Sequence, residues 1–589
     1  MATRQIRNNN RNRRRGRSRR RRGPGIANIL FVLLCLIFMG IMVAGGYFYI
    51  KKYAPTTAKL PLDEYYTYFH GDEASVVIND ALIEAEEDAD TGAAIVRDGH
   101  LYLERYVLKD NIDDRYAFDD MESVMRYVTD SDVISVPYED SAYTVSGEAA
   151  EAEMPIVITV YDHVFVACDF AVLYSDFTYS LAQEPYRAAI YTAGFTRDVA
   201  KAKSKAAVRR LGGPKSKILT EVRRGASLSI IKNHGKWSNV VTEDGVIGYV
   251  KNRQLGNVSE VTVASTLDER EYRHELMDET VIMAWDMVLS ESANDGIEKR
   301  LAEAEPLNVI SPTWYNLNDD RGGIDDRSDA EYVKACHDMG LEVWVLINDI
   351  EVRDVDHVLV LNTTSSRDRL IDNLMTSAAS SGIDGINVDF EHIPVDAVDG
   401  YLEFIRELSL RCHEKGMRVS VDNYAPAAFN EYYNRHEQSL YADYIVLMAY
   451  DEYYSGGEEA GSNSSLPFVK EAAEATLKEV PAEQFICGLP FYCREWMESG
   501  GELTSKTLGM DDAAKYIDSH KLTPEWDDEL GLNYTEYTDG DTKHMLWIED
   551  ERSFEAKLEA VKSIGAAGYS FWKLGHEIDS IWAVISKYE

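Results

Sequence analysis

The sequence predicts an α/β protein in which a C-terminal (β/α)8 barrel follows a small β-barrel, a β-rich stalk and one N-terminal transmembrane helix. Three observations predict this order. Apolar runs of strand length alternate with amphipathic stretches over residues 278–589, short β-branched runs fill residues 60–256, and an uncharged stretch follows an arginine-rich start. The chain of 589 residues is 45% hydrophobic and 11% aromatic, which excludes a wholly disordered protein.

Residues 1–26 are expected to form a basic tail and residues 27–50 a transmembrane helix. No charged side chain occurs between Ala27 and Ile50. At ~1.5 Å per residue this stretch is ~36 Å long, enough for a hydrocarbon core of ~30 Å. The alternative is a cleaved signal peptide, but its apolar region is normally about 7–15 residues long and ends in a small-residue cleavage site. We therefore expect an uncleaved anchor.

The distribution of charge predicts the topology and excludes one class of partner. Many arginines precede the helix and only Lys51 and Lys52 follow it, which places the N-terminus in the cytoplasm and the chain from about residue 53 outside the cell. The arginine run resembles a nucleic-acid arm, but its position beside the helix favours a topology signal or contact with anionic lipid. The net charge is −40 despite this basic start, so the body should repel nucleic acid.

The cysteines indicate neither a disulfide framework nor a metal site. Cys35 lies in the apolar segment, which leaves an odd number of cysteines outside it. No Cys/His cluster has the spacing of metal ligands, so we expect no metal and no cofactor.

The stalk, residues 60–195, contains two similar stretches, AAIVRDGHLYLERYVL and MPIVITVYDHVFVACDFAVL. Each predicts a strand, an Asp-containing turn and a second strand, so the pair is interpreted as an internal repeat of small β-rich units. The pattern resembles the copper-amine-oxidase N-terminal-like stalk domains of bacterial surface proteins. The resemblance implies a spacer or interaction module, and the sequence shows no ligand set for copper.

Residues 203–256 predict a small five-stranded β-barrel, because short alternating runs are separated by Gly, Asn and Asp turn signals. The pattern resembles a bacterial Src-homology-3-like domain, to which Trp237, Gly248, Tyr249 and Val250 correspond. That family implies a cell-wall peptide as partner. The alternative is a plain β-barrel with Trp237 in its core.

A helical linker, LDEREYRHELMDE, is expected before the barrel domain, residues 278–589. Strand-like runs then open near eight positions, and amphipathic stretches separate most of them, which predicts eight βα units. A polar, aromatic insertion around residues 498–548 interrupts the last interval, and such loops build substrate clefts. The run starts are Val281, Asn308, Leu341, Gly385, Arg418, Tyr444, Phe485 and Ala566.

The fourth run carries the side chains with catalytic chemistry and reads Asp384-Gly385-Ile386-Asn387-Val388-Asp389-Phe390-Glu391. Because side chains alternate along a strand, Asn387, Asp389 and Glu391 share one face, which points into the barrel. Ionised carboxyls crowded there are too costly for a purely structural role. Two carboxyls whose Cα atoms are ~7 Å apart, at ~3.3 Å per residue, should raise one pKa, as a general acid requires.

This run resembles the signature Asp-Gly-x-Asp-x-Asp-x-Glu of glycoside hydrolase family 18. Asp384, Gly385, Asp389 and Glu391 match, whereas Asn387 replaces the first Asp of the inner pair. The resemblance extends over about residues 281–589, since MAYDEYYSGG, GLPFYCREW and GYSFWKLGHE are similar to the later strands of that family. It is strongest to the bacterial cell-wall and spore-cortex branch, which tolerates Asn at this position.

The resemblance implies the roles of the catalytic residues. Glu391 would protonate the glycosidic oxygen and later activate water. Asp389 would orient the 2-acetamido group of the substrate, whose carbonyl oxygen attacks the anomeric carbon in place of an enzyme nucleophile. Tyr450 would hydrogen-bond that acetamido oxygen.

The substrate-binding residues would be Asp384, Asn387, Asp451 and Trp572, with Trp572 as the apolar floor beneath the sugar. Asp384 is seven residues before Glu391, so the alternation along a strand puts the two side chains on opposite faces. A role in a turn is therefore the alternative for Asp384. A core role is the alternative for Tyr450 and Trp572.

Other residues of the barrel remain open. His392 differs in parity from Glu391, so solvent or loop packing is expected in place of a proton relay. Trp285, Trp314 and Trp344 either line a glycan groove or belong to the core.

The sequence thus predicts a membrane-anchored extracellular retaining glycosidase that cleaves β-linked N-acetylglucosamine polymer, with peptidoglycan favoured over chitin. The alternatives are an inactive, lectin-like glycan-binding protein and a structural spacer of the envelope.

Overall fold

The computed structural model describes residues 25–85, 90–352 and 354–589, so nearly all of the expected basic tail lies outside the described residues. The chain divides into two compact units. The first comprises the chain up to Tyr68, Ser75–Leu82 and Ser180–Val263, and the second comprises Phe69–Ala74, Ile83–Tyr179 and Ala264–Glu589.

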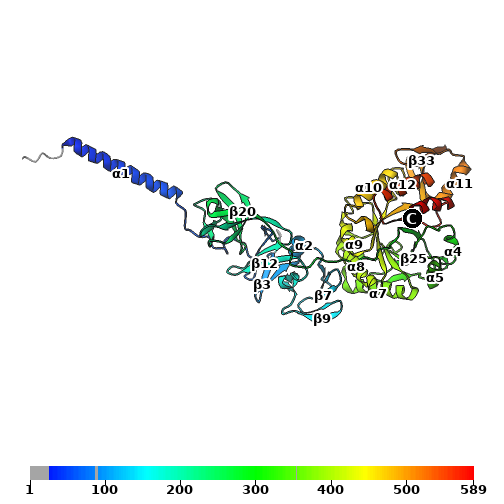
Figure 1. Ribbon diagram of the computed structural model, residues 1–589, viewed down its shortest axis with the longest axis horizontal. Helices are drawn as coiled ribbons and strands as arrows, with labels where there is room; N and C mark the ends of the chain where they lie inside the picture. Colours follow the sequence, from blue (N-terminus) through cyan, green and yellow to red (C-terminus); the bar gives the residue numbers. More distant parts are fainter. Residues whose placement is uncertain (1–24, 86–89, 353) are drawn as a thin grey trace, which may run out of the picture. The chain divides into compact units, whose positions relative to one another are not determined.

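Helix α1 (Ile26–Tyr53) is the predicted apolar helix (Figure 1). It is exposed along its length and carries Lys51 and Lys52 in its last turn. Among the described residues it is the one helix long and apolar enough to cross a membrane. Its length and composition fit an anchor and also fit a signal sequence.

The larger sheet of the first unit contains the strands expected over residues 203–256, and two further strands, β14 and β20, extend it at one edge. Gly248 lies where β19 passes β15, and a Cβ there would be 2.6 Å from Val208 Cγ1, so only glycine fits. Trp237 is buried, as the core interpretation expects. The order is β16 (Ile218–Val222), β15 (Ala206–Arg209), β19 (Ile247–Lys251), β18 (Trp237–Thr242), β17 (Ser227–Asn233), β14 (Thr196–Ala202) and β20 (Leu255–Thr262).

A smaller sheet of the first unit has the order β12-β13-β1-β2. Its strands β1 and β13 run parallel, with Val76 opposite Ala188. The bounds are β12 (Phe177–Ala182), β13 (Arg187–Thr192), β1 (Ser75–Ile78) and β2 (Ala81–Ile83).

The predicted repeat of the stalk forms one sheet in the second unit, in the order β10-β11-β4-β3. Each half is a hairpin followed by a helix, and β4 and β11 pair antiparallel, with Leu103 opposite Val166. Asp98 and Asp162 have positive φ in the two turns, which a tight hairpin requires. The bounds are β3 (Ala94–Arg97), β4 (His100–Glu104), α2 (Arg105–Asn111), β10 (Val157–Val160), β11 (His163–Ala167) and α3 (Cys168–Ala171).

A second antiparallel sheet is inserted between the two hairpins, and its strands pair in sequence order. It comprises β5 (Ala117–Asp119), β6 (Val124–Val128), β7 (Val133–Pro137), β8 (Ala142–Val145) and β9 (Glu148–Glu151). Residues 90–179 are called the β-module below.

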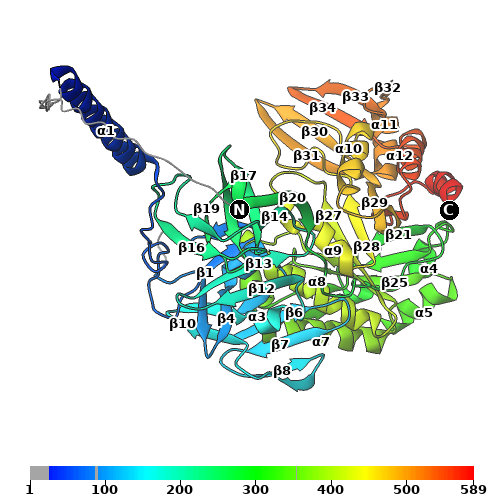
Figure 2. The same cartoon turned by 60° about the vertical axis from the view of Figure 1, so that its left-hand side comes forward.

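The C-terminal domain is the predicted eight-stranded parallel barrel, as the described residues show (Figures 1 and 2). Pairing of β22 with β25 and of β21 with β35 closes it. Every strand begins within two residues of its predicted start. The strands are β21 (Val281–Asp286), β22 (Val309–Pro312), β25 (Glu342–Asn348), β26 (Gly385–Asp389), β27 (Arg418–Tyr424), β28 (Tyr444–Met448), β29 (Phe485–Pro490) and β35 (Gly568–Trp572).

Helices cover the outside of the barrel, and the alternation of side chains along its strands separates two cores. Ile386 and Val388 of β26 pack outward among helical residues, whereas Trp285, Trp344 and Val446 pack inside the barrel. The main helices are α4 (Ile297–Arg300), α5 (Ala330–Asp338), α6 (His357–Asn362), α7 (Thr364–Ser381), α8 (Val398–His413), α9 (Arg435–Tyr441), α10 (Leu466–Thr476), α12 (Glu551–Ser563) and α13 (Trp582–Ile585).

The cysteines outside α1 all lie in the second unit. All the cysteines there fall within the described ranges, and each is buried and without a disulfide. They are Cys168, Cys336, Cys412, Cys487 and Cys493.

The predicted insertion between β29 and β35 folds as an antiparallel sheet with one helix, and in Figures 1 and 2 it lies beside α10 and α12. The order of its strands is β31-β30-β34-β33-β32. The bounds are β30 (Tyr492–Ser499), β31 (Glu502–Gly509), α11 (Met510–His520), β32 (Glu525–Asp527), β33 (Leu532–Asp539) and β34 (Thr542–Ile548). A short hairpin of β23 (Tyr315–Leu317) and β24 (Ile324–Asp326) follows β22.

The prediction of a helical linker is wrong. Residues 267–279 adopt no helix and instead lie along the N-terminal end of the barrel. The backbone N–H of Glu275 donates to Asp443, and that of Met277 donates to the hydroxyl of Tyr444 at 2.7 Å. Bonds to the barrel replace those that a helix would have made within the linker.

Candidate active site

A cluster of polar side chains lies inside the barrel at the C-terminal ends of β26, β27 and β28. Asn387 and Asp389 end β26 and are buried, as the alternation along the strand predicts, and Glu391 follows in the loop. Asp422 and Tyr424 come from β27, the next strand. The predicted residues Asn387, Asp389, Glu391, Tyr450 and Trp572 are therefore at one end of the barrel, the end at which barrel enzymes bind substrate.

Asn387 is the centre of the buried hydrogen-bond network. Its Oδ1 accepts from Trp285 Nε1 at 2.9 Å and from Ser311 Oγ at 3.2 Å. Its Nδ2 donates to Ser420 Oγ at 3.0 Å and to Asp422 Oδ1 at 2.8 Å. Both ends of the amide are thus satisfied, as a fully buried polar side chain requires.

Three carboxyls share this cluster, and burial raises the pKa of each. For Asp389, the charges of Asp422 and Glu391 raise the pKa further, well above the ordinary value. Burial raises the pKa of Asp422 in the same way, although Asn387 opposes the shift. Like charges in a buried site cannot all ionise, so the cluster retains protons near neutral pH.

Glu391 has the environment of a general acid. Burial raises its pKa above the ordinary value, and a hydrogen bond from the hydroxyl of Tyr424 limits that rise. A carboxyl with a raised pKa stays protonated near neutrality and can donate a proton.

Asp349, which follows β25 directly, holds the loop that carries Glu391. Its carboxylate accepts from the backbone N–H groups of Glu391 and His392, each at 2.9 Å. Burial would raise its pKa, but the neighbouring His357 and these two N–H groups together lower it. The side chain of His392 is 61% exposed, which agrees with its expected position in solvent.

Tyr450, Asp451 and Trp572 lie at the same end of the barrel, where Tyr450 and Trp572 are half-buried and Asp451 is exposed. The ring of Tyr450 packs edge-on against Tyr492, and burial together with the nearby carboxyls raises its pKa well above the ordinary value. Asp451 accepts from Tyr492 Oη and from Arg494, both at 2.7 Å. Trp572 packs edge-on against Trp285 with ring centroids 5.7 Å apart.

Asp384 does not join these residues. It precedes β26, at the opposite end of the strand from Glu391. Its Oδ2 interacts with His337 Nε2 at 2.7 Å and accepts from the backbone N–H of Val343 at 2.8 Å. Asp384 therefore links β26 to β25, which is the turn-type role that its parity allowed.

Large apolar side chains are exposed on the rim around the cluster. They lie on the loops that follow successive barrel strands, and loops of this kind form the substrate face of a barrel. A polymer with apolar faces, such as a sugar chain, can bind along such a rim. The residues are Met287, Leu289, Ile350, Val395, Phe429 and Tyr454.

Sequence reasoning missed Asp349, Asp422 and Tyr424. The parity of RVSVDNY would have placed Asp422 and Tyr424 on the inner face, because Val419 and Val421 are outward core residues. Asp349 follows the apolar run of β25, and a polar residue directly after a barrel strand is a signal of the same kind. Of the three early tryptophans, Trp285 and Trp344 are inner core and Trp314 is outer core.

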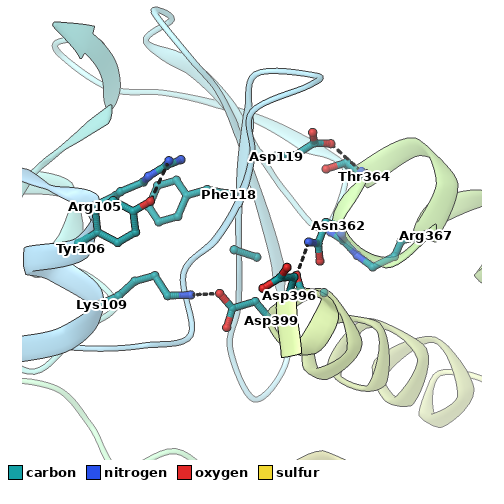
Figure 3. A pocket seen from close by; sticks show the side chains of 12 residues that line it. Arg105, Tyr106, Lys109, Phe118, Asp119, Asn362, Thr364, Arg367, Asp396 and Asp399 are labelled. Atoms are coloured by element: carbon teal, nitrogen blue, oxygen red, sulfur yellow. Dashed lines mark hydrogen bonds and ion pairs between the residues drawn. The ribbon is translucent and has the colours of Figure 1, made fainter. Parts of the chain in front are cut away.

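A pocket of about 180 Å³ lies between the β-module and the barrel helices (Figure 3). Its charged groups bind one another. Lys109 Nζ donates to Asp399 at 2.6 Å, and Asp119 accepts from the backbone N–H of Thr364 at 2.7 Å. These bonds join the two parts of the second unit, and the pocket is a seam between them.

A scan of family models matches residues 316–577 to glycosyl hydrolases family 18. A cortical fragment-lytic enzyme of Bacillus subtilis (strain 168) is 26% identical over 237 residues, which are 39% of this chain and 55% of that protein. The uncharacterized glycosylase YvbX of the same organism is 28% identical over 259 residues, 42% of this chain and 75% of that protein. The chain thus spans about half the length of the first of these relatives.

Solved structures also align with the chain. That of the Bacillus megaterium QM B1551 spore cortex-lytic enzyme SleL has 18% identity and a TM-score of 0.47, and the alignment covers 56% of this chain and 76% of that one.

Proposed function

We propose that the protein is a retaining glycosidase that cleaves β-linked N-acetylglucosamine polymer, since residues 316–577 within the barrel match the model of glycosyl hydrolases family 18. Peptidoglycan is favoured over chitin, since the most similar relatives include a cortical fragment-lytic enzyme. The single observation that carries the proposal is the position of Glu391, a partly buried acid of raised pKa just after the C-terminal end of a barrel strand.

Glu391 acts first as the acid and then as the base. Its carboxyl donates a proton to the glycosidic oxygen as the bond to the leaving sugar breaks. The carbonyl oxygen of the substrate's own acetamido group forms the new bond to the anomeric carbon, which closes a five-membered ring on the sugar. Water then attacks the anomeric carbon and opens this ring, and the Glu391 carboxylate accepts the proton that the water loses. The enzyme therefore needs no nucleophile of its own.

The neighbouring side chains hold the acetamido group. Asp389 orients and polarises it, and Tyr450 hydrogen-bonds its oxygen. Asn387 fixes the base of the subsite, Asp451 lines its edge and Trp572 forms the apolar floor beneath the sugar.

The test is the release of reducing ends from N-acetylated glycans by the full chain in detergent. Glu391→Gln should abolish turnover and retain glycan binding, because the amide keeps the shape of the carboxyl but cannot donate the proton. A wild type that binds glycan without cleaving it would establish the lectin-like alternative.

A substrate analogue that lacks the acetamido group tests the mechanism separately. We expect it to be cleaved at least ~10²-fold more slowly than the natural glycan, because the attacking oxygen is gone. An equal rate would contradict the substrate-assisted mechanism while leaving glycosidase activity intact.

We also propose that α1 anchors the protein in the cell membrane, with the N-terminus in the cytoplasm and the barrel outside. The apolar length of α1 and the asymmetry of charge around it support this. Intact cells treated with protease should lose the barrel domain, whereas recovery of a chain that begins after residue 53 in the medium would indicate a cleaved signal sequence.

The same proposal includes the limits of the domains, which are residues 1–26, 27–50, 60–195, 203–256 and 278–589. The region 203–256 is proposed as a Src-homology-3-like module that binds cell-wall peptide, and the β-rich region before it as a spacer or interaction module. Binding of a peptidoglycan stem peptide, measured by calorimetry, tests the first of these assignments.

A further inference from the structure

A buried carboxyl on β27 lies against the position at which the family signature has a carboxyl and this chain has an amide. Asp422 Oδ1 accepts from Asn387 Nδ2 at 2.8 Å. The side chain is buried within the barrel and comes from the strand next to β26. The carboxyl that is absent from one strand is therefore present on its neighbour.

The surrounding donors fix the orientation of this pair. The indole of Trp285 can only donate, and it donates to Asn387 Oδ1 together with Ser311 Oγ. The Nδ2 group must therefore face Ser420 and Asp422. An aspartate at position 387 would present a second oxygen to Asp422, so the amide and the carboxyl complement each other.

The groups that face Asp422 are mostly acids or phenols. Asp389 and Glu391 lie on β26 and in the loop after it, and Tyr450 follows β28; the charge of each interacts with that of Asp422. Asp389 Oδ1 is itself buried and has no hydrogen-bond partner within the described residues. The charge of Asp422 raises the pKa of Asp389.

We propose that Asp422 is a positioning residue that takes the place of the carboxyl missing at position 387, orienting Asn387 and setting the protonation of Asp389. This inference rests on the proposed function, because Asp389 is the residue that orients the acetamido group. Asp422 itself need not touch the substrate.

An exchange of the two side chains tests the inference in the full chain. Asp422→Asn keeps the shape and the acceptor oxygen but removes a negative charge beside Asp389, so the pKa of Asp389 should fall. We expect kcat to drop about tenfold or more and the acidic limb of the pH–rate profile to move to lower pH. Asn387→Asp alone adds a carboxyl and should also lose activity.

The double variant N387D/D422N restores one amide and one carboxyl. The aspartate at 387 would accept from Trp285, Ser311 and the new amide at 422, so every donor is again satisfied. We expect it to recover most of the wild-type rate and pH profile. The inference would be overturned if the fold-loss of kcat in the double variant equalled the product of the fold-losses in the two single variants.

Asp443→Asn is the matched control, because Asp443 is a buried aspartate before β28 at the other end of the barrel. It should lower stability without moving the pH profile. A wild type that cleaves no N-acetylated glycan would overturn the proposed function and this inference with it. A cleaving wild type whose D422N variant keeps its rate and profile would overturn this inference alone.

Discussion

The hydroxyl of Tyr424 tunes the acid Glu391. It donates a hydrogen bond to the carboxyl of Glu391 and so favours the ionised form, against the effect of burial. In Tyr424→Phe this bond is lost, so the pKa of Glu391 should rise. The alkaline limb of the pH–rate profile should then move to higher pH, because Glu391 stays protonated up to a higher pH.

Tyr432→Phe is the control for this prediction. Its hydroxyl donates to the backbone oxygen of Ile393 at 3.2 Å and has no bond to Glu391. It should leave the alkaline limb in place. Equal profiles for wild type and Y424F would show that the hydroxyl has no influence on the acid.

The residues of the motif could be assigned from sequence only as far as strand parity allows. Parity along β26 correctly placed Asn387 and Asp389 inside the barrel. It also made a role of Asp384 in substrate binding doubtful, and in the structure Asp384 accepts a hydrogen bond from the backbone of β25. Parity would have placed Asp422 inside the barrel, but it cannot reveal that Asp422 bonds to Asn387 or that Asp349 bonds to the loop after β26, because these contacts depend on how three strands align.

At the scale of elements, Asp349 couples β25 to the loop after β26. Its side chain is fully buried and accepts two backbone N–H bonds from that loop. Asp349→Ala should destabilise the chain by about 2 kcal/mol, since buried donors lose their partner. It should also lower kcat by displacing Glu391, as urea unfolding and turnover assays would measure.

This bond also predicts a dependence of stability on pH. The pKa of Asp349 is lower in the folded chain than in the unfolded chain. Its stabilising contribution is therefore present above about pH 4 and is lost as the pH falls through the lowered pKa. In D349A the acid side of the stability–pH curve should be flatter, and an unchanged curve would contradict the role of this carboxylate.

The elements of the barrel were predictable because their periodicity is strong and their order is regular. The linker was not, because residues 267–279 have a helical pattern but bond to the barrel through Glu275 and Met277. Tertiary contacts there outweigh local preference. The same limit applies to β14 and β20, which extend a sheet whose neighbouring strands were predicted.

At the scale of the molecule, the β-module is part of the catalytic body. Arg126 on β6 donates to Asp368 on α7 and to Glu407 on α8 at 2.7–2.9 Å. Glu407 is almost fully buried and also accepts a hydrogen bond from Arg367. The stalk was expected to be a spacer or interaction module, and this part of it neutralises charges inside the barrel domain.

Arg126→Met should therefore destabilise the second unit by about 3 kcal/mol, because Glu407 would lose a buried partner. The midpoint of urea unfolding measures this. Arg105→Met is the matched control, since Arg105 pairs with the largely exposed Asp120 and should change stability by less than about 1 kcal/mol. Equal effects of the two changes would contradict a stabilising role of the seam.

The buried cysteines of the second unit can report when that unit opens. Burial raises the pKa of Cys336, Cys487 and Cys493 to about 12, so their reactive thiolate forms are scarce while the fold is intact. An alkylating reagent should therefore label these positions only in molecules that have transiently unfolded. Mass spectrometry of the labelled peptides would then rank the parts of the protein by how often each one opens.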